Sequence, residues 1–472
     1  MTMQIFNLII SIVALTFIGF NILCLFPENS RKFFLWEAIA ISFGLGIAAL
    51  TIEMLLFYFL QFDFNVTGLL LAWLILLGVN ILRISRGREL PVIETLPGPV
   101  KAYGMLDIFL IAGISFEIFH AFFRALVRPI EAYDAVAIYA IKSKIFYLAN
   151  SIPQEYFAYL ARLFPHPDYP LNIPLAETFL YMCMGNLNDQ LVKIIFALFF
   201  CGILGMFYFT VRRFSDRTYA LLFTFLLASV PQFNAYATNA YLEVPLAYYY
   251  FASVLFLLRW FEDSSDVASL VMSAFMVAMA GWTKNEGLLY CVINSLMVCL
   301  FVVSDRRNFS LKRLLYPIFY GSVIFIALFP WNLAKGIWHI SNDEINLANI
   351  NPANLIKQAG KLMPIFYELQ KQLFGPKKWN ILWPAFFLVL AIHHKKLFTR
   401  TQKYLTSSVV LAVGGYIIFY MISYVDVVFF ASKTWSRFLI HFLPVVMLLM
   451  AMLLKEDRIS SYSKRRQGEG GQ

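Results

Sequence analysis

Long apolar runs recur along almost the whole chain, and they limit its possible folds more than any other feature. A helix needs roughly 20 apolar residues to cross about 30 Å of hydrocarbon, and thirteen runs of near this length are present. They lie at residues 4–25, 34–60, 66–83, 105–125, 191–211, 218–231, 241–259, 266–282, 287–304, 314–334, 379–393, 404–424 and 438–454. A membrane span must satisfy its backbone polar groups internally, so each run predicts a helix. We expect an all-α, polytopic membrane protein with about 13 transmembrane helices.

Composition and charge agree with this class. Of the 472 residues, 60% are hydrophobic and 14% are charged, which excludes an ordinary soluble domain. If the N-terminus lies outside, the Lys and Arg residues of the short loops gather on the cytoplasmic side, as the positive-inside rule requires. The net charge of +10 therefore indicates topology and contact with anionic membrane lipids, and no nucleic-acid partner is expected. This orientation predicts a multi-pass protein of the cell (inner) membrane.

Cysteine usage adds little to the functional question. Four cysteines lie in predicted spans and Cys183 stands alone outside them. This pattern indicates neither a disulfide framework nor a cysteine metal site.

The predicted orientation places two long polar segments, residues 126–190 and 335–378, on the outer side. In the first segment, Glu131 and Asp134 directly follow a span, and residues 133–150 have the pattern of a helix lying in the membrane interface. The run Phe164-Pro-His-Pro-Asp-Tyr-Pro170 follows, and its three prolines predict a rigid loop. Residues 171–184 predict a second interfacial helix.

Three further polar motifs interrupt apolar sequence at outer span ends, where charges are costly. They are YLEVP (241–245), TKNEG (283–287) and TWSR (434–437), the last followed by His441. Lys284 and Glu286 fit either a tight turn with a local ion pair or a substrate contact. Arg437 begins the last span on the outer side, against the positive-inside bias, and this placement favours contact with an anionic lipid or pyrophosphate.

In order and spacing, these motifs resemble the bacterial multi-pass glycosyltransferases of the GT-C fold. The motifs are EAYDAVAIYAIKSK (131–144), HPDYP (166–170), YLEVPLA (241–247), TKNEG (283–287) and SRFLIHFLP (436–444). The chain is similar to the protein O-mannosyltransferases and the lipid A aminoarabinose transferases over residues 105–455. Such enzymes move a sugar from a polyprenyl-phosphate carrier to a lipid, glycan or protein acceptor on the outer face, with inversion.

The resemblance implies three divisions of the chain. Residues 1–104 would form N-terminal helices with a cytoplasmic loop, residues 105–455 a catalytic module, and residues 456–472 a basic cytoplasmic tail. The family's acidic motif falls on Glu131 and Asp134, although here two residues separate the carboxylates and three spans precede the usual first one.

The chemistry of the transfer assigns roles to the candidate residues. Displacing a phosphate from an anomeric carbon needs a base but no general acid, since the leaving group is weakly basic. We expect Asp134 to be the base, with Glu131 assisting; the alternatives are a helix N-cap for Asp134 and a solvated surface position for Glu131. Cations must stabilise the departing phosphate.

The remaining expected roles are these. The donor phosphate would be bound by Lys142, Lys284 and Arg437, and the rest of the substrate by Asp168, Tyr169, Glu243 and Glu286. Lys142 and Lys144 lie about 200° apart on a helix, so they should differ in role. Asp168 also fits an Asx-turn that stabilises its own loop. No cofactor or protein-bound metal is expected, although two carboxylates are able to hold Mg²⁺ through waters.

Two other classes fit parts of the pattern. Glu53, Asp107 and Glu117 lie in or beside early spans and would suit a proton-coupled transporter or flippase of lipid-linked sugars. A ligase or polymerase of lipid-linked glycans would also act on the outer face. The gathering of polar residues in outer segments, and not at the middle of the membrane, favours the transferase.

Overall fold

The computed structural model describes residues 2–26, 33–87, 102–158, 166–304, 311–340, 349–399 and 401–455. Every regular element within these residues is a helix, so the predicted all-α class is confirmed. The predicted basic tail at 456–472 and the beginning of the second polar segment at 341–348 lie outside the described residues.

All thirteen predicted spans contain a helix, but not all of these helices are long enough to cross a membrane. Among the described residues, nine reach the length and apolarity of a span: α1 (Thr2–Leu23), α2 (Leu35–Phe59), α3 (Val66–Ser85), α4 (Met105–Val127), α9 (Ile194–Phe214, preceded by α8, Asp189–Val192), α12 (Glu243–Glu262), α14 (Gly287–Ser304), α15 (Leu315–Ile337) and α20 (Gln402–Ile422). Helices α10 (Arg217–Ala228), α13 (Val267–Thr283) and α19 (Leu382–Ile392) are apolar but shorter.

The last predicted run, residues 438–454, covers the second half of a broken helix and the end of its first half. Helix α21 (Val427–His441) and helix α22 (Leu443–Leu454) meet at an angle of 54°. Pro444 has no N–H to donate to the carbonyl of Ile440, so a straight helix cannot continue through this point. Arg437 lies about one turn before the break.

Short helices fill the polar segments. The first segment contains a π-helical turn (Ala135–Ala140), α5 (Ile141–Ala149), α6 (Gln154–Ala158) and α7 (Asn172–Met184). Helix α11 (Pro231–Tyr236) precedes α12, and the second segment contains α16 (Pro352–Lys357), α17 (Leu362–Leu373) and α18 (Pro376–Trp379). Both predicted helices of the first segment are therefore present. Residues 172–181 of α7 are all buried, so this helix lies inside the protein and not on a membrane surface.

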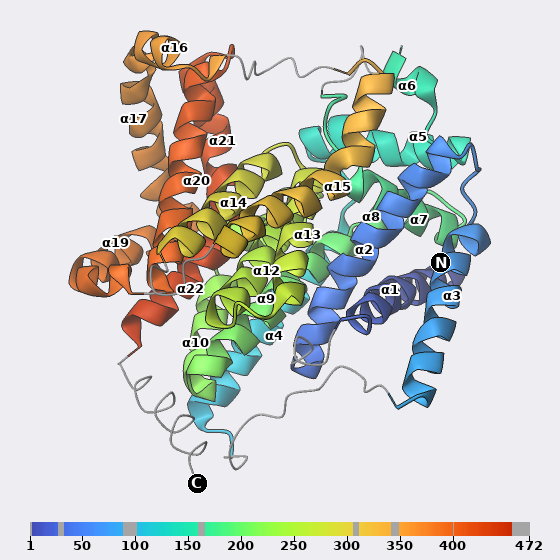
Figure 1. Ribbon diagram of the computed structural model, residues 1–472, viewed down its shortest axis with the longest axis horizontal. Coiled ribbons are helices and arrows are strands. Elements are labelled where there is room, and N and C mark those ends of the chain that lie inside the picture. The colour runs from blue at the N-terminus through green and yellow to red at the C-terminus, as the bar shows by residue number, and fades with distance from the viewer. Residues whose placement is uncertain are drawn as a thin grey trace.

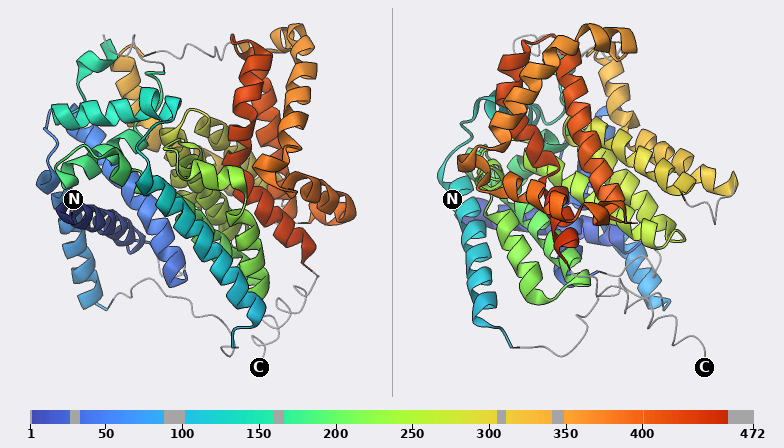
Figure 2. Two further views of the ribbon diagram at one scale, coloured as in Figure 1. Left: turned by 180° about the vertical axis from the view of Figure 1, so that it is seen from behind. Right: turned by 90° about the vertical axis from the view of Figure 1, so that its left-hand side faces the viewer.

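Helix α12 forms the centre of the molecule. Almost all of its residues are buried, and it packs against α9, α13 and α21. Figure 1 shows α9, α12, α13 and α14 at the centre, with α1 to α3 on one side and α17, α20 and α21 on the other. From behind, α4 runs obliquely across the bundle (Figure 2).

The N-terminal helices join this bundle through α2. Helices α1 and α2 pack closely at Gly19. A Cβ atom at this position would lie only 1.9 Å from the Ser42 carbonyl oxygen, so no larger residue fits there. Helix α2 also packs against α7, α9 and α12. The predicted division at residue 104 stays a prediction, but α2 contacts the elements that carry the polar motifs.

Candidate functional site

Five charged side chains from four parts of the sequence meet at one end of the bundle, and we call them the site cluster. They are Asp134, Glu243, Lys284, Glu286 and Arg437. Asp134 precedes the π-helical turn, Glu243 is the first residue of α12, and Arg437 lies in α21. Lys284 and Glu286 occupy the turn between α13 and α14. All five were predicted as site residues from the sequence.

The cluster is a chain of alternating charges. An Arg437 Nη1 atom donates to Asp134 Oδ2 at 2.6 Å, and Arg437 Nε donates to Glu243 Oε1 at 2.7 Å. Lys284 Nζ lies 3.1 Å from the same Glu243 oxygen and 2.8 Å from Glu286 Oε1. Every cation thus lies between two carboxylates, which offsets the cost of burying it.

Local structure explains two of these positions. Lys284 is the C-cap of α13 and Glu243 lies in the first turn of α12, so each charge has the sign that its helix end favours. The turn after Lys284 is tight, since a Cβ atom on Gly287 would lie 2.1 Å from backbone atoms of Ala280. Glycine is therefore required at the end of the TKNEG motif.

Exposure increases along the cluster toward Asp134. The side chains of Glu243 and Lys284 are 0% and 1% exposed, that of Arg437 is 15% exposed, and that of Asp134 is 23% exposed. The Asp134 carboxylate makes no side-chain N-cap bond, so the capping alternative is not realised. It is the one carboxylate of the cluster that combines partial exposure with an arginine contact. This placement suits a group that must meet an incoming hydroxyl.

Four buried polar atoms around the cluster have no hydrogen-bond partner among the described residues. They are Glu243 Oε2, Glu286 Oε2, Tyr139 Oη and His441 Nε2. Buried polar groups are nearly always paired, so a concentration of unpaired ones indicates capacity for a polar ligand. Burial, with a smaller effect of Glu243, raises the pKa of the Tyr139 phenol, which therefore remains a hydrogen-bond donor.

Lys142 holds the proline-rich loop. Its ammonium donates to the backbone carbonyls of His166, Pro167 and Tyr169 at 3.1, 3.4 and 3.0 Å, and the residue is fully buried. Burial lowers the pKa of Lys142 to about 7, and the Asp168 carboxylate opposes this shift. The predicted phosphate contact of Lys142 stays a prediction, and this geometry favours a loop-positioning role instead. Lys144 pairs with Asp189 at 2.7 Å, so the two lysines differ in role, as expected.

Asp168 and Tyr169 join the loop to the site cluster. Asp168 Oδ2 accepts a hydrogen bond from Asn285 Nδ2 at 2.5 Å, and Asn285 lies between Lys284 and Glu286. The Tyr169 ring lies 6.0 Å from Lys284 Nζ and meets the Tyr139 ring edge-on at 5.8 Å. These contacts place both residues beside the cluster, and their predicted role in substrate binding stays a prediction.

Among the described residues, the Glu131 side chain makes no hydrogen bond or ion pair with the cluster. It forms an ion pair with Arg128 at 3.1 Å, and both side chains are more than half exposed. Its predicted assistance to Asp134 stays a prediction, and its partner and exposure match the solvated alternative.

Sequence reasoning did not single out three neighbours of the cluster. Tyr139 and Asn285 lie within quoted motifs, and Tyr241 lies with its ring 4.7 Å from the Arg437 guanidinium carbon. These residues could have been identified from the sequence as site neighbours, because each is a tyrosine or asparagine within a motif that carries the charged candidates. His441, which follows the TWSR motif, lies 2.7 Å from Tyr416 Oη through its Nδ1 atom.

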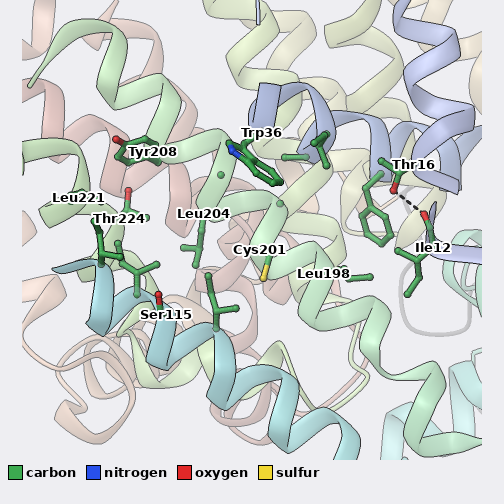
Figure 3. Close-up of a pocket in the computed structure, with 18 residues that line it drawn as sticks. Ile12, Thr16, Trp36, Ser115, Leu198, Cys201, Leu204, Tyr208, Leu221 and Thr224 are labelled. Atoms are coloured by element: carbon green, nitrogen blue, oxygen red, sulfur yellow. Dashed lines mark hydrogen bonds between the residues drawn. The ribbon is translucent and has the colours of Figure 1, made fainter. Parts of the chain in front are cut away.

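The described residues contain no group of three or more His, Cys, Asp or Glu side chains arranged to hold a metal ion. The expected independence of metal stays a prediction. A cavity of about 510 Å³ lies elsewhere, between α1, α2, α4, α9 and α10 (Figure 3). Its lining contains no charged side chain, so it does not suit a phosphate.

Comparison with known proteins gives a family match over part of the chain and a similar fold. Residues 168–333 match the family described as dolichyl-phosphate-mannose-protein mannosyltransferase. The structure is similar to the crystal structure of ArnT from Cupriavidus metallidurans bound to undecaprenyl phosphate, with a TM-score of 0.51 and 17% sequence identity. The match covers 76% of this chain and 62% of ArnT, so the chain spans less than two thirds of that protein. A search of curated proteins found no match. The predicted resemblance to GT-C glycosyltransferases is confirmed.

Proposed function

We propose that this chain, a multi-pass membrane protein with the GT-C fold, transfers a sugar from a polyprenyl-phosphate donor to a lipid, glycan or protein hydroxyl. The observation that carries the proposal is the Arg437 guanidinium, which contacts the partly exposed Asp134 carboxylate and the buried Glu243 carboxylate. This contact places a base candidate beside a fixed cation. The family match over 168–333, which includes Glu243, Lys284 and Glu286, supports the same class.

Asp134 is the proposed base. Its Oδ2 is fixed by Arg437, and its Oδ1 makes no hydrogen bond among the described residues. An acceptor hydroxyl that donates to Oδ1 is thereby oriented for attack on the anomeric carbon, and the carboxylate removes its proton as the new bond forms. Attack opposite the phosphate gives a single displacement with inversion.

Arg437 and Lys284 are the proposed phosphate contacts. The two carboxylate contacts of Arg437 use Nε and Nη1, which leaves N–H donors on Nη2 for a phosphate oxygen. As the sugar–phosphate bond breaks, negative charge grows on the phosphate, and a nearby fixed cation stabilises it. The match to a protein crystallised with undecaprenyl phosphate supports a donor of this class.

The unpaired buried atoms are the proposed sugar contacts. The unpaired oxygens Glu243 Oε2 and Glu286 Oε2 are able to accept hydrogen bonds from a sugar, and the Tyr139 hydroxyl is able to donate one. A polyhydroxylated ring supplies partners of both kinds. Asp168 and Tyr169 complete the substrate-binding side through the loop held by Lys142.

Further parts of the proposal concern location and metal. The basic short loops of the sequence favour a site facing the outer, periplasmic side of the cell membrane. The leaving phosphate carries one phosphoryl group, and the site cluster holds two protein cations, of which Arg437 contacts the base, so we propose a reaction that needs no divalent cation. Full activity of EDTA-treated protein would support this; loss that Mg²⁺ or Mn²⁺ restores would contradict it.

The central experiment compares Asp134→Asn with Glu131→Gln. Purified protein in lipid would be assayed for sugar transfer from a panel of polyprenyl-phosphate sugars to membrane extracts. We expect Asp134→Asn to lower turnover by roughly 10²–10⁴-fold, the range for loss of a general base. Glu131→Gln should change it by less than about threefold, since exposed ion pairs contribute little.

Mass spectrometry of surface glycans and glycolipids from a deletion strain would identify the sugar and acceptor. Restoration of the missing product by Asp134→Asn at matched abundance would rule out Asp134 as base. Build-up of lipid-linked precursor inside the cell in both the deletion and the Asp134→Asn strain would favour a transporter.

A further inference from the structure

A chain of buried hydrogen bonds lies next to the site cluster and includes the second N-terminal helix. Thr51 of α2 donates from its hydroxyl to Asn172 Oδ1 at 2.8 Å, and Asn172 Nδ2 donates to Thr283 Oγ1 at 2.9 Å. Trp282 Nε1 donates to Thr51 Oγ1 at 3.2 Å. All four residues are at most 2% exposed, so water does not compete for these bonds.

Thr51 and Thr283 lie at the two ends of this chain of bonds. An indole N–H only donates, so the Thr51 oxygen accepts from Trp282. The Thr51 hydroxyl proton has two acceptors within reach, Asn172 Oδ1 at 2.8 Å and the Ala48 carbonyl of its own helix at 3.1 Å. At the other end, Thr283 donates to the Met279 carbonyl at 2.7 Å and accepts from Asn172 Nδ2, so the Asn172 amide oxygen lies toward α2 and its nitrogen toward α13.

The chain connects three segments that the proposed site needs. Thr283 directly precedes Lys284, and Asn172 follows Asp168 and Tyr169 by a few residues. Thr51 lies in α2, which belongs to the helices that precede the first polar segment.

Helix α2 is itself firmly held. Tyr249 Oη donates to the Gly44 carbonyl at 2.8 Å, and Tyr248 Oη donates to the Ala40 carbonyl. Nearer the start of the helix, Glu37 pairs with Arg213 and Arg259. A helix fixed at these places is a rigid reference for groups bonded to Thr51.

We infer that Thr51 is a positioning residue, through which α2 sets the places of Lys284 and of the loop 166–172 relative to one another. The N-terminal helices therefore contribute to the geometry of the site without touching substrate. The expected effect of Thr51 on donor binding rests on the proposed function. Its expected effect on the order of the backbone in the two segments does not.

The test uses Thr51→Val, which keeps the shape of the side chain and removes the hydroxyl's bonds to Asn172, to Trp282 and to the Ala48 carbonyl of its own helix. It leaves the Trp282 N–H and the Asn172 carbonyl buried without partners, whereas Thr51→Ser keeps the hydroxyl. Thr224→Val is a matched control, because the buried Thr224 hydroxyl bonds only the Ala220 carbonyl of its own helix.

Two quantities would be measured on protein in lipid nanodiscs below its melting temperature: amide hydrogen exchange of residues 166–172 and 283–287, and affinity for a polyprenyl phosphate. For Thr51→Val we expect faster exchange in both segments and a roughly threefold to tenfold weaker affinity, the effect of one or two lost hydrogen bonds. Thr51→Ser should restore both quantities, and Thr224→Val should change neither.

Unchanged exchange in Thr51→Val would overturn the inference, as would equal changes in Thr224→Val, which would show general loosening. If the wild-type protein does not bind a polyprenyl phosphate, the proposed donor fails, while exchange still decides the positioning role. Normal donor binding in Thr51→Val with faster exchange would contradict the link to the site.

Discussion

Helix α12 carries a charged cluster at each end, and the two differ in how completely their atoms are paired. Glu243 begins the helix in the site cluster, and Arg259 lies in its last turn beside Glu37 and Arg213. About 24 Å separates positions 243 and 259 along a helix. Both clusters bury a carboxylate almost completely against two cations.

The Glu37 cluster satisfies all its acceptors. Glu37 Oε1 accepts from Arg213 at 2.8 Å and Arg259 at 2.9 Å, while Oε2 accepts from Arg213 at 2.5 Å and from the Phe34 backbone at 3.3 Å. Phenylalanine rings cover both guanidinium groups. Nothing in this arrangement has capacity for a ligand, so its role is to join α2, α9 and α12.

The site cluster leaves acceptors unused. Glu243 directs one oxygen to both Arg437 and Lys284, and its other oxygen has no partner among the described residues. The same residue types thus give a structural joint at one end of α12 and a candidate site at the other. The difference teaches that incomplete pairing of buried polar atoms, and not burial of charge, distinguishes the candidate site from a structural ion pair.

Of the changes that test this comparison between the two clusters, Arg437→Gln should have the largest effect. Loss of the cation removes the Asp134 contact and one phosphate contact, so turnover should fall by roughly 10²–10³-fold, as for loss of an electrostatic transition-state contact. Arg259→Gln is the matched change at the other end and should leave turnover per folded protein nearly unchanged. Steady-state transfer assays on both variants would measure this. Similar losses in both would mean that the two ends do not differ in function.

Glu37→Gln should lower stability without altering catalysis. The variant removes the Glu37 carboxylate from Arg213 and Arg259, whose side chains are 22–29% exposed, so water relieves part of the cost. We expect the free energy of unfolding to fall by about 2 kcal/mol, below the full penalty for a broken buried pair. Thermal unfolding in detergent, together with the donor KM of the folded fraction, would test this. A raised KM at unchanged stability would assign the Glu37 cluster a functional role.

Lys142→Met should raise the donor KM by up to about tenfold, because the loop carrying Asp168 and Tyr169 loses three backbone contacts. Since burial lowers the pKa of Lys142 to about 7, the wild-type ammonium loses its proton as pH rises through 7. The neutral amine has two donors for three carbonyls, so the wild-type KM should rise above pH 7. Lys142→Met should show a high KM at every pH. Lys144→Met, which breaks a partly exposed ion pair, is the control.

Glu177→Gln should have the smallest effect and tests a buried carboxyl that no cation contacts. Ser143 donates to Glu177 at 2.6 Å, and burial raises the pKa of this carboxyl from 4.5 to about 7. Between these values the unfolded chain loses its proton while the folded protein keeps it, so stability falls as pH rises. Glu177→Gln should remove this slope and stabilise the protein at pH 8 by on the order of 1 kcal/mol. Melting temperatures at pH 4.5 and pH 8 would show it; an equal slope in both proteins would contradict it.

The sequence by itself determined the helical membrane class and the membership of the site cluster. Apolar runs of near-span length allow little but helices, because lipid offers no partners to the backbone. Charges such as Lys284 and Arg437 at span ends are costly and therefore conspicuous. Asp134 was selected for a different reason, because it follows a span in the first polar segment. The same reasoning also selected Glu131 and Lys142, because residue type and spacing do not reveal which partner a side chain meets.

Only the tertiary structure decided those partners. Arg437 meets Asp134 across 303 positions of sequence, and Lys142 is turned into the proline-rich loop instead of toward the cluster. Thr51 was no more conspicuous than any other threonine in a span, yet its hydroxyl joins α2 to the segments beside Lys284. Hydrophobic burial depends on the composition of each segment, and composition can be read directly from a sequence. Hydrogen bonds require two atoms within about 3 Å of each other, and residues far apart in the sequence reach that distance only once the helices have packed.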